Sequence, residues 1–547
     1  MSERTLAATR KITVRRILQL PVKRAAFPCV VSLFVMGFGQ GVAQANDVYI
    51  AQNAGGSANG SSCANAYAVG YFNTPGNWTS GTPSATQIGP GTTLHLCGTF
   101  NAPAGASGYL QFQGGGTSGN PITLVAEPGT LIQAPYWGQN GAITSRYGYV
   151  VIDGNSMGMI QATANGTNLT YQAPSCGAIC GSGIYVSSGN NITVRNWTIA
   201  NIYVNVPPSD ESTAGEGSYG IVVLGGSNNA VSGNTLHDMK WAVYYAYPGS
   251  STSSNISVFN NQIYNADHGI AIGSGNTSAV LNGGNIYGNV IHDGANWDDN
   301  ANNNHHDGVH LWAIHSGSQS NNVSVHNNYI YGQWGQHLNS LIYGEGAQAN
   351  LLVYNNVLVS ATSNGFCGGG ILSIAGQGLT NSYPSLYNNT IENAANSGNS
   401  CPLFGITNTT GISIRDNIAS TGISAIYMPT GSTFNTISNN LWYGIGSVGW
   451  NYQSGAYSRL SAWQTACSCD AGASVGAPML DTNYKPQAGS PAIGLGANLT
   501  SLGISTLNFD MAGVTRPSTG AWDAGAYQFG GSTVGPSPPT TLTTQVH

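Results

Sequence analysis

Ile286-Tyr-Gly-Asn289-Val-Ile291 is the stretch that decides the fold, because its pattern returns along the chain. The pattern is an apolar residue, two spacers, an asparagine, one spacer and a second apolar residue. It recurs at 231–236, 258–263, 325–330, 353–358 and 386–391, with its asparagines 27, 28, 39, 28 and 33 residues apart. A fixed period of this length is the signature of a solenoid, in which each repeat stacks on its neighbours.

Each period also contains a second apolar run, such as Gly269-Ile-Ala-Ile272 or Gly308-Val-His-Leu311. Two or three short strands per period, joined by Gly and Asn corners, are typical of one coil of a parallel β-helix. We expect the repeated asparagine to lie at a turn in the left-handed conformation and to bond to its counterpart one coil away. Over about residues 120–450 the chain resembles the pectate-lyase-like superfamily, which implies an all-β, right-handed parallel β-helix in a single elongated domain.

The two ends of the chain have different compositions from the repeats. Residues 1–45 hold seven of the fourteen Lys and Arg, an apolar run at 27–38 and the triplet Ala43-Gln44-Ala45, which predicts a cleaved export signal. Residues 46–120 resemble the superfamily's N-terminal entry coils, and 121–450 form the β-helix. Residues 451–529, including Trp522-Asp-Ala-Gly-Ala-Tyr527, resemble a C-terminal closing segment, and 530–547 are expected to be disordered.

The charge and the apolar content of the mature chain limit the kinds of partner that it can have. Seven Lys and Arg oppose nineteen Asp and Glu, a formal charge of −12, and so few cations cannot form the footprint that nucleic acid requires. After residue 45 no apolar stretch reaches the ~18 residues of a membrane helix. We therefore expect a secreted protein, extracellular, periplasmic or on the cell surface, with no nucleic-acid partner and no membrane insertion. The oligomeric state stays open.

Eight cysteines remain after the export signal, an even number that predicts disulfide bonds in an exported protein. Proximity along a stack of coils suggests Cys63 with Cys97, Cys176 with Cys180 and Cys367 with Cys401. Cys467 and Cys469 are predicted not to pair with each other, since only one residue separates them.

Histidines and acids gather in one region of about one hundred residues. Nine of the eleven histidines lie there: His237, His268, His292, His305, His306, His310, His315, His326 and His337. Seven acids accompany them: Asp238, Asp267, Asp293, Asp298, Asp299, Asp307 and Glu345. Asp238 and Asp293, each in a repeated His-Asp pair, are more simply explained as corner residues than as catalysts.

Alignment of the apolar runs predicts which of these side chains share a surface. We place Gly220, Ala242, Gly269, Gly308, Ser340 and Gly370 one above another, about 4.8 Å apart as in neighbouring strands. One patch then contains Lys240, Trp241, Tyr244, Asp267, His268, His306, Asp307 and His310, with Glu345 near its edge. An insertion at 297–307 opens beside this patch, as is usual for the binding face of a repeat protein.

The patch predicts a carbohydrate-active site, most simply that of a glycoside hydrolase. Such enzymes use two carboxyl groups, about 5 to 5.5 Å apart for retention and roughly 6.5 to 9.5 Å for inversion. Asp267 and Asp307 are expected at about 6 to 8 Å, which favours inversion. His268 or His306 would tune the acid, and Lys240 would keep one carboxylate ionised. The residues expected to bind substrate are His310, Tyr244, Trp241, Trp297, Trp312, Trp334 and Glu345, although the aromatic ones could simply stack between coils.

A local resemblance points to the same class of enzyme. Ala266-Asp-His-Gly269 resembles the Gly-His-Gly coil of polygalacturonase-type hydrolases, and His306-Asp-Gly-Val-His310 resembles their Asn-Thr-Asp-Gly coil. In that family the aspartate coil comes first, whereas here it comes second. We therefore carry over no catalytic role.

Three alternatives remain open at this stage. A hydrolase would require no cofactor, yet Asp298, Asp299 and Asp307 could bind Ca²⁺, and His305, His306 and His310 could bind a transition metal. A lyase or epimerase acting on a uronate could use Lys240, Tyr244 and His268, although no Arg lies between Arg195 and Arg415. A non-catalytic surface protein would use the patch only to bind a glycan.

Overall fold

The computed structural model describes residues 46–164, 181–202, 218–247, 249, 251–274, 276–295, 305–335, 337–361, 369–393 and 401–531. Several of the predictions above fall outside these ranges: the export signal, the tail from residue 532, and Cys176, Cys180, Cys367, Trp297, Asp298 and Asp299.

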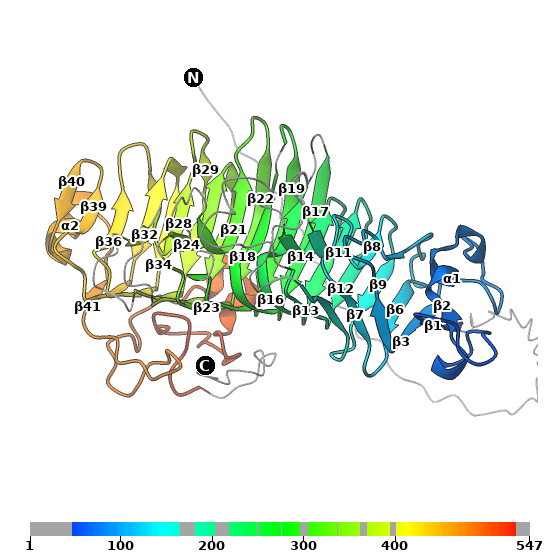
Figure 1. Ribbon diagram of the computed structural model, residues 1–547. Helices are drawn as coiled ribbons and strands as arrows, with labels where there is room; N and C mark the ends of the chain where they lie inside the picture. The colour runs from blue at the N-terminus through cyan, green and yellow to red at the C-terminus, as the bar shows by residue number, and fades with distance from the viewer. Residues whose placement is uncertain are drawn as a thin grey trace, which may run out of the picture. The chain divides into compact units, whose positions relative to one another are not determined.

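Most of the described strands stack in parallel along the coils (Figure 1), and their pairing defines three stacks. The first stack runs through β1 (Asp47–Ala51), β3 (Thr93–Cys97), β6 (Ile122–Ala126), β9 (Val150–Asp153), β12 (Ile192–Arg195), β15 (Ala230–Ser232), β17 (Thr252–Phe259), β19 (Val280–Tyr287), β22 (Gln319–His326), β26 (Leu352–Tyr354), β30 (Ser385–Tyr387), β34 (Ile412–Arg415) and β37 (Phe434–Ser438).

The second stack runs through β4 (Thr99–Asn101), β7 (Leu131–Ala134), β10 (Met159–Ala162), β13 (Thr198–Ala200), the start of β16 (Thr235–Ala246), the start of β18 (Gln262–Ser274), β20 (Val290–His292), β23 (Tyr329–Gly332), β27 (Val357–Ser360), β31 (Thr390–Asn393), β35 (Ile418–Ser420), β38 (Leu441–Tyr443) and β41 (Ser474–Val475).

The third stack is the one that carries the predicted patch. It runs through β11 (Gly181–Ser187), β14 (Ser218–Leu224), the ends of β16 and β18, β21 (His306–Ala313), β24 (Leu338–Gly346), β28 (Leu372–Ala375), β32 (Pro402–Thr407), β36 (Ser424–Met428) and β39 (Gly449–Tyr452). The predicted all-β, right-handed parallel β-helix is thereby confirmed, and its stacks cross residues 120 and 450 without a break.

The core lies inside the coils, where alternate residues of each strand point inward. In the third stack Ile221, Val243, Ile270, Val309 and Ile342 lie in register, and all five are buried in the same core cluster. The residues that directly follow them, such as Tyr244 and His310, point outward, whereas preceding residues such as Ala242 and Leu341 belong to the core. The two α-helices of the described chain are short: α1 (Val69–Asn73) and α2 (Leu460–Cys467). None of the described helices has the length and apolar character to cross a membrane.

The repeated asparagines form a continuous ladder inside the turns between the first and second stacks. Asn328 is typical: its Nδ2 donates to Ile286 O and to Asn356 Oδ1, each at 3.0 Å, and its Oδ1 accepts from Asn289. The predicted bond between counterparts is confirmed. The predicted left-handed conformation is wrong for the ladder residue itself, since the positive φ belongs to the residue before it, such as Asn327 at 54°.

This division of roles has a physical reason. The residue in the left-handed conformation points its side chain out of the coil, where it is free to contact the closing segment. Asn327 Nδ2 donates to Asp510 O at 3.3 Å, and Asn355 Nδ2 donates to Phe509 O at 2.7 Å. The ladder residue faces inward, where only its counterparts and the backbone can pair with it. The closing segment therefore folds back along the coils.

Two disulfide bonds join described cysteines. Cys63 and Cys97 are bonded, as predicted. Cys467 and Cys469 are bonded to each other, so the prediction that they do not pair is wrong. Ser468, between them, adopts the left-handed conformation after α2, which turns the chain sharply and leaves the two Cα atoms 5.1 Å apart. Cys401 is also disulfide-bonded, and its predicted partner lies outside the described residues.

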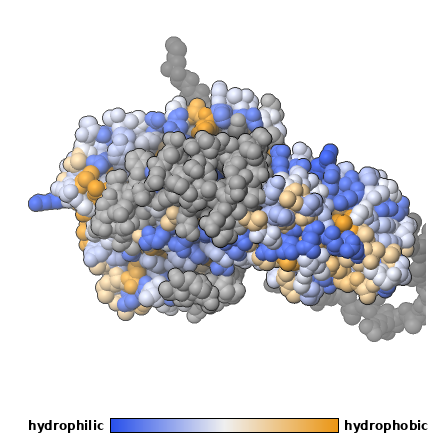
Figure 2. All heavy atoms as spheres, viewed as in Figure 1, coloured by the Kyte–Doolittle hydropathy of each residue, from blue (hydrophilic) through white to orange (hydrophobic). Residues whose placement is uncertain are grey.

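The exposed large apolar side chains include those of Met157, Tyr383 and Phe529. Among the coloured residues of Figure 2, hydrophilic and hydrophobic ones are interspersed on the face shown. Isolated apolar residues of this kind are normal on a soluble surface and indicate no binding site by themselves.

Candidate functional site

The register of the third stack brings the predicted patch together. Trp241, His268 and Asp307 are successive partners across β16, β18 and β21, as the sequence alignment predicted. Three residues further along the same strands, Tyr244, Ala271 and His310 are also in register. Asp238 and Asp293 lie away from the patch, at corners with φ of 57° and 58°, which agrees with the corner interpretation.

The alignment fails at the next strand because β24 contains an irregularity. His306 pairs with Leu338 but Asp307 pairs with Ser340, so Asn339 is an extra residue in the ladder. The column that contains His310 therefore continues to Tyr343 and Ser373 rather than to Ile342 and Leu372. Sequence alignment of the apolar runs could not detect this one-residue shift.

Asp267 is fully buried, and both of its carboxylate oxygens are used by histidines. Oδ2 accepts from His268 Nδ1 at 2.9 Å, and Oδ1 accepts from His306 Nδ1. Burial alone would raise the pKa of Asp267, but the charges of His268 and His306 and the hydrogen bonds from them hold it below its usual range. Asp267 thus fixes two imidazole rings and has no oxygen left to contact a substrate.

Asp307 is also fully buried, but its two carboxylate oxygens have different surroundings. Oδ1 accepts from Ser340 N at 3.0 Å and from Asn339 Nδ2 at 3.2 Å. Oδ2 faces three imidazole nitrogens: His305 Nε2 at 3.1 Å, His268 Nε2 at 3.5 Å and His310 Nδ1 at 3.6 Å. These four atoms lie within 4.8 Å of one another, and none has a hydrogen-bond partner among the described residues. We call these four residues the His–Asp cluster.

The cluster determines the ionisation of its members. Burial alone would lower the pKa of His305, but the nearby Asp307 carboxylate raises it to about 9. For His268, burial dominates and its pKa is lowered despite the two flanking carboxylates. The cluster thus combines a carboxylate with one imidazole whose pKa is raised and another whose pKa is lowered. Such an arrangement is able to hold a cation or a proton.

The geometry does not support the predicted pair of catalytic aspartates. The imidazole of His268 lies between the two carboxyl groups, with Nδ1 facing Asp267 and Nε2 facing Asp307. A glycosidic bond cannot occupy the space that this ring fills. Both carboxylates are also fully buried, whereas a general acid must contact the sugar oxygen.

The aromatic side chains of the patch pack against the histidines. Trp241 stacks on His268 with ring centroids 4.2 Å apart, and Tyr343 stacks on His310 at 4.9 Å. Trp312 lies 5.2 Å from His310 and is largely buried. Trp334, expected to contact sugars, is fully buried and donates from Nε1 to Tyr331 O, so that expectation is wrong.

The remaining predicted residues surround the cluster. Glu345 Oε2 accepts from His310 Nε2 at 3.0 Å and pairs in register with Trp312. Tyr244 lies 5.9 Å from Trp312, nearly parallel to it. Lys240 is largely buried on β16 and precedes Trp241, as Asp267 precedes His268 on β18. The sequence analysis did not identify Tyr343 and Asn339 as site residues, because their positions depend on the irregularity in β24.

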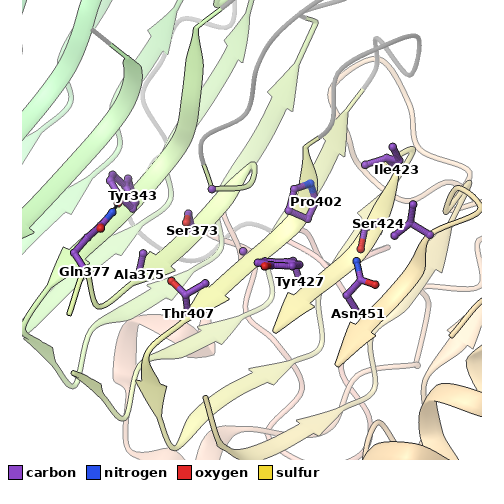
Figure 3. A pocket seen from close by; sticks show the side chains of 13 residues that line it. Tyr343, Ser373, Ala375, Gln377, Pro402, Thr407, Ile423, Ser424, Tyr427 and Asn451 are labelled. Atoms are coloured by element: carbon purple, nitrogen blue, oxygen red, sulfur yellow. Dashed lines mark hydrogen bonds between the residues drawn. The ribbon is translucent and has the colours of Figure 1, made fainter. Parts of the chain in front are cut away.

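A cavity of about 340 Å³ adjoins the cluster on the same outward face. Its lining includes Tyr343, Ser373, Tyr427 and Asn451, which lie on β24, β28, β36 and β39 of the third stack (Figure 3). Among the described residues that line it, none carries a charge. A second cavity, of about 370 Å³, lies beyond the other side of the patch and is lined by Arg146 and Tyr185 among others.

No family model matches this chain. No curated protein matches it in sequence. The solved structures similar to it include the pectate lyase Pel9A, at 16% identity and TM-score 0.38, covering 89% of this chain and 98% of that one. A lacto-N-biosidase of family GH136 from Eubacterium ramulus is 12% identical, with TM-score 0.38 and coverage of 74% and 66%. The A-module of the mannuronan C-5 epimerase AlgE4 from Azotobacter vinelandii is 14% identical, with TM-score 0.33 and coverage of 62% and 90%.

Proposed function

We propose that the protein is an exported carbohydrate-active enzyme that binds an extended, neutral glycan along the outward face of the third stack and hydrolyses it beside the His–Asp cluster. The observation that carries this proposal is a column of outward residues that extends from the cluster across the following strands of the third stack. In register, its members are His310, Tyr343, Ser373, Gly405, Tyr427 and Asn451. Five strand spacings of about 4.8 Å give it a length of roughly 24 Å, which suits a chain of several sugars.

The chemistry of the column supports a sugar ligand. Tyr427 is 44% exposed and offers a flat apolar surface of the kind on which a sugar ring stacks. Ser373, Thr407 and Asn451 supply neutral hydrogen-bonding groups beside it. At Gly405 the backbone of Gly369 lies against the column, since a Cβ atom there would lie 1.9 Å from Gly369 O. The described lining carries no Lys or Arg that would pair with a uronate, and it therefore favours a neutral glycan.

Glu345 is the group that we assign as the proton acceptor. It contacts His310 within the cluster, and its register partner Ala375 lines the cavity, so it lies where the cluster meets the column. Its side chain is 16% exposed, unlike the two buried aspartates. A carboxylate in this position can take a proton from the water that attacks the anomeric carbon, while the sugar oxygen that leaves takes up a proton from solvent.

The test is a glycan panel incubated with the purified chain after removal of residues 1–45. Release of reducing ends without ultraviolet absorbance would support hydrolysis. Absorbance from unsaturated products would instead show that the enzyme is a lyase. Glu345→Gln is expected to lower kcat by at least about 100-fold. Wild-type activity in that variant would refute the assignment, and no reaction or binding on any glycan would refute the proposed function.

A matched pair of tyrosine variants tests the column. Tyr427→Ala is expected to weaken glycan binding about tenfold, because it removes the stacking surface. Tyr443→Ala, with 40% exposure but on β38 of the second stack, is expected to leave binding unchanged. Equal effects of the two substitutions would place the glycan elsewhere.

A further inference from the structure

The four facing atoms of the His–Asp cluster lie at ion-pair distances, yet no contact among them has the geometry of a hydrogen bond. His268 Nε2, His310 Nδ1 and Asp307 Oδ2 belong to side chains that are each more than nine-tenths buried, and none has a hydrogen-bond partner. His305 Nε2 is buried as an atom and also lacks one. Buried polar atoms are almost always paired, so four unpaired atoms aimed at one point indicate a ligand at that point.

The spacing of these atoms matches that of ligands around one small cation. Bonds of about 2.0 to 2.2 Å to zinc place the ligand atoms of a tetrahedron roughly 3.3 to 3.6 Å apart. Asp307 Oδ2 lies 3.1, 3.5 and 3.6 Å from the nitrogens of His305, His268 and His310. One cation between the four atoms, which lie within 4.8 Å of one another, would satisfy them all once the imidazole nitrogens draw closer together.

The surroundings orient these ligands in the manner of a metal site. The outer nitrogen of His268 is bonded to Asp267, and the outer nitrogen of His310 is bonded to Glu345. A carboxylate behind each imidazole fixes the ring and leaves its inner nitrogen free to bind a metal. Asp307 Oδ1 is likewise occupied by Ser340 N, which leaves Oδ2 as the metal-facing oxygen.

We infer that His268, His305, Asp307 and His310 form a binding site for one divalent transition-metal ion of the zinc class. Three imidazoles and one carboxylate suit zinc and its first-row neighbours, whereas calcium requires six to eight oxygen ligands. Of the histidines that the sequence suggested, His305 and His310 are retained, and His306 is replaced by His268 because His306 Nδ1 is bonded to Asp267. The site goes beyond the proposed function, since it concerns the ligand atoms alone and does not depend on glycan cleavage.

The experiment measures metal binding directly on the mature chain. The protein is stripped with a chelator and titrated calorimetrically with Zn²⁺ and, separately, with Ca²⁺, and its metal content is determined by mass spectrometry. One Zn²⁺ per chain and a far weaker response to Ca²⁺ are expected. A response to Ca²⁺ alone, or to neither ion, would overturn the inference and leave the cluster as an ion-paired network.

Substitutions then assign the ligands. His268→Ala and His310→Ala are each expected to weaken Zn²⁺ binding by at least about 100-fold, and Asp267→Asn, a positioning change, by about 10- to 100-fold. His237→Ala, which alters a His–Asp pair outside the cluster, is the control and should bind as the parent does. Unchanged affinity in folded His268→Ala protein, with folding checked by circular dichroism, would overturn the assignment.

Cobalt substitution provides a readout that does not require a variant. Co²⁺ bound by nitrogen and oxygen ligands in a tetrahedral site absorbs more strongly in the visible range than hydrated Co²⁺, so the stripped protein should become coloured on titration. Glycan binding measured separately distinguishes the two claims. If the protein binds metal but no glycan, this inference is supported and the proposed function is refuted. If it binds a glycan but no metal, the inference is refuted and the proposed function is supported.

Discussion

Replacement of Asn328 by alanine should destabilise the β-helix strongly, because Asn328 lies in the middle of the buried asparagine ladder. Its side chain donates to Ile286 O and Asn356 Oδ1 and accepts from the Asn289 N and Nδ2 atoms, with distances of 2.9 to 3.0 Å. Its side chain is fully buried, so water cannot replace these partners. Four lost hydrogen bonds at about 1 kcal/mol each predict a loss of about 4 kcal/mol.

The assay is denaturant-induced unfolding followed by tryptophan fluorescence, combined with amide hydrogen exchange read by mass spectrometry. Exchange should accelerate most in 286–289 and 353–357, the turns that flank the lost side chain. The control is Asn321→Ala, which removes a single exposed bond to Asn282 and should change the free energy of unfolding by about 0.5 kcal/mol or less. Equal losses in Asn328→Ala and Asn321→Ala would refute the view that the ladder stabilises the coils.

Two further predictions concern the disulfides and the pH dependence of stability. Cys63 and Cys97 close a loop with a separation of 34 residues, and Cys467 and Cys469 close one with a separation of 2. Chain entropy therefore predicts losses of about 4 kcal/mol for Cys63→Ser and about 1 kcal/mol for Cys467→Ser. Denaturant titration of the two variants checks this, and a larger loss for Cys467→Ser would contradict it. Burial raises the pKa of Asp416 from 3.8 to about 7, so its neutral form stabilises the fold; that stabilisation is complete below about pH 4 and lost as the pH rises through about 7. Thermal midpoints from pH 4 to 8 should decline less in Asp416→Asn than in the parent, and parallel declines would exclude Asp416 as the cause.

The sequence alone was sufficient to predict the fold. A β-helix is built from local repeats, and the period of its apolar residues fixes which side chains face the core, because successive residues of a strand alternate between two faces. The alignment therefore placed Trp241, His268 and Asp307 in one column correctly. It also identified the asparagine ladder, since identical residues one period apart lie beside each other in any such stack.

The chemistry of the site required the tertiary structure. Alternation gives the face on which a side chain lies but not the direction of its ring nitrogens or carboxylate oxygens, which hydrogen-bond partners from other coils determine. Asp267 was therefore interpreted as a catalyst, although it holds His268 and His306 in place. The extra residue Asn339 shifted every later column by one position, and a repeat pattern cannot reveal such a shift because the apolar run on either side stays intact.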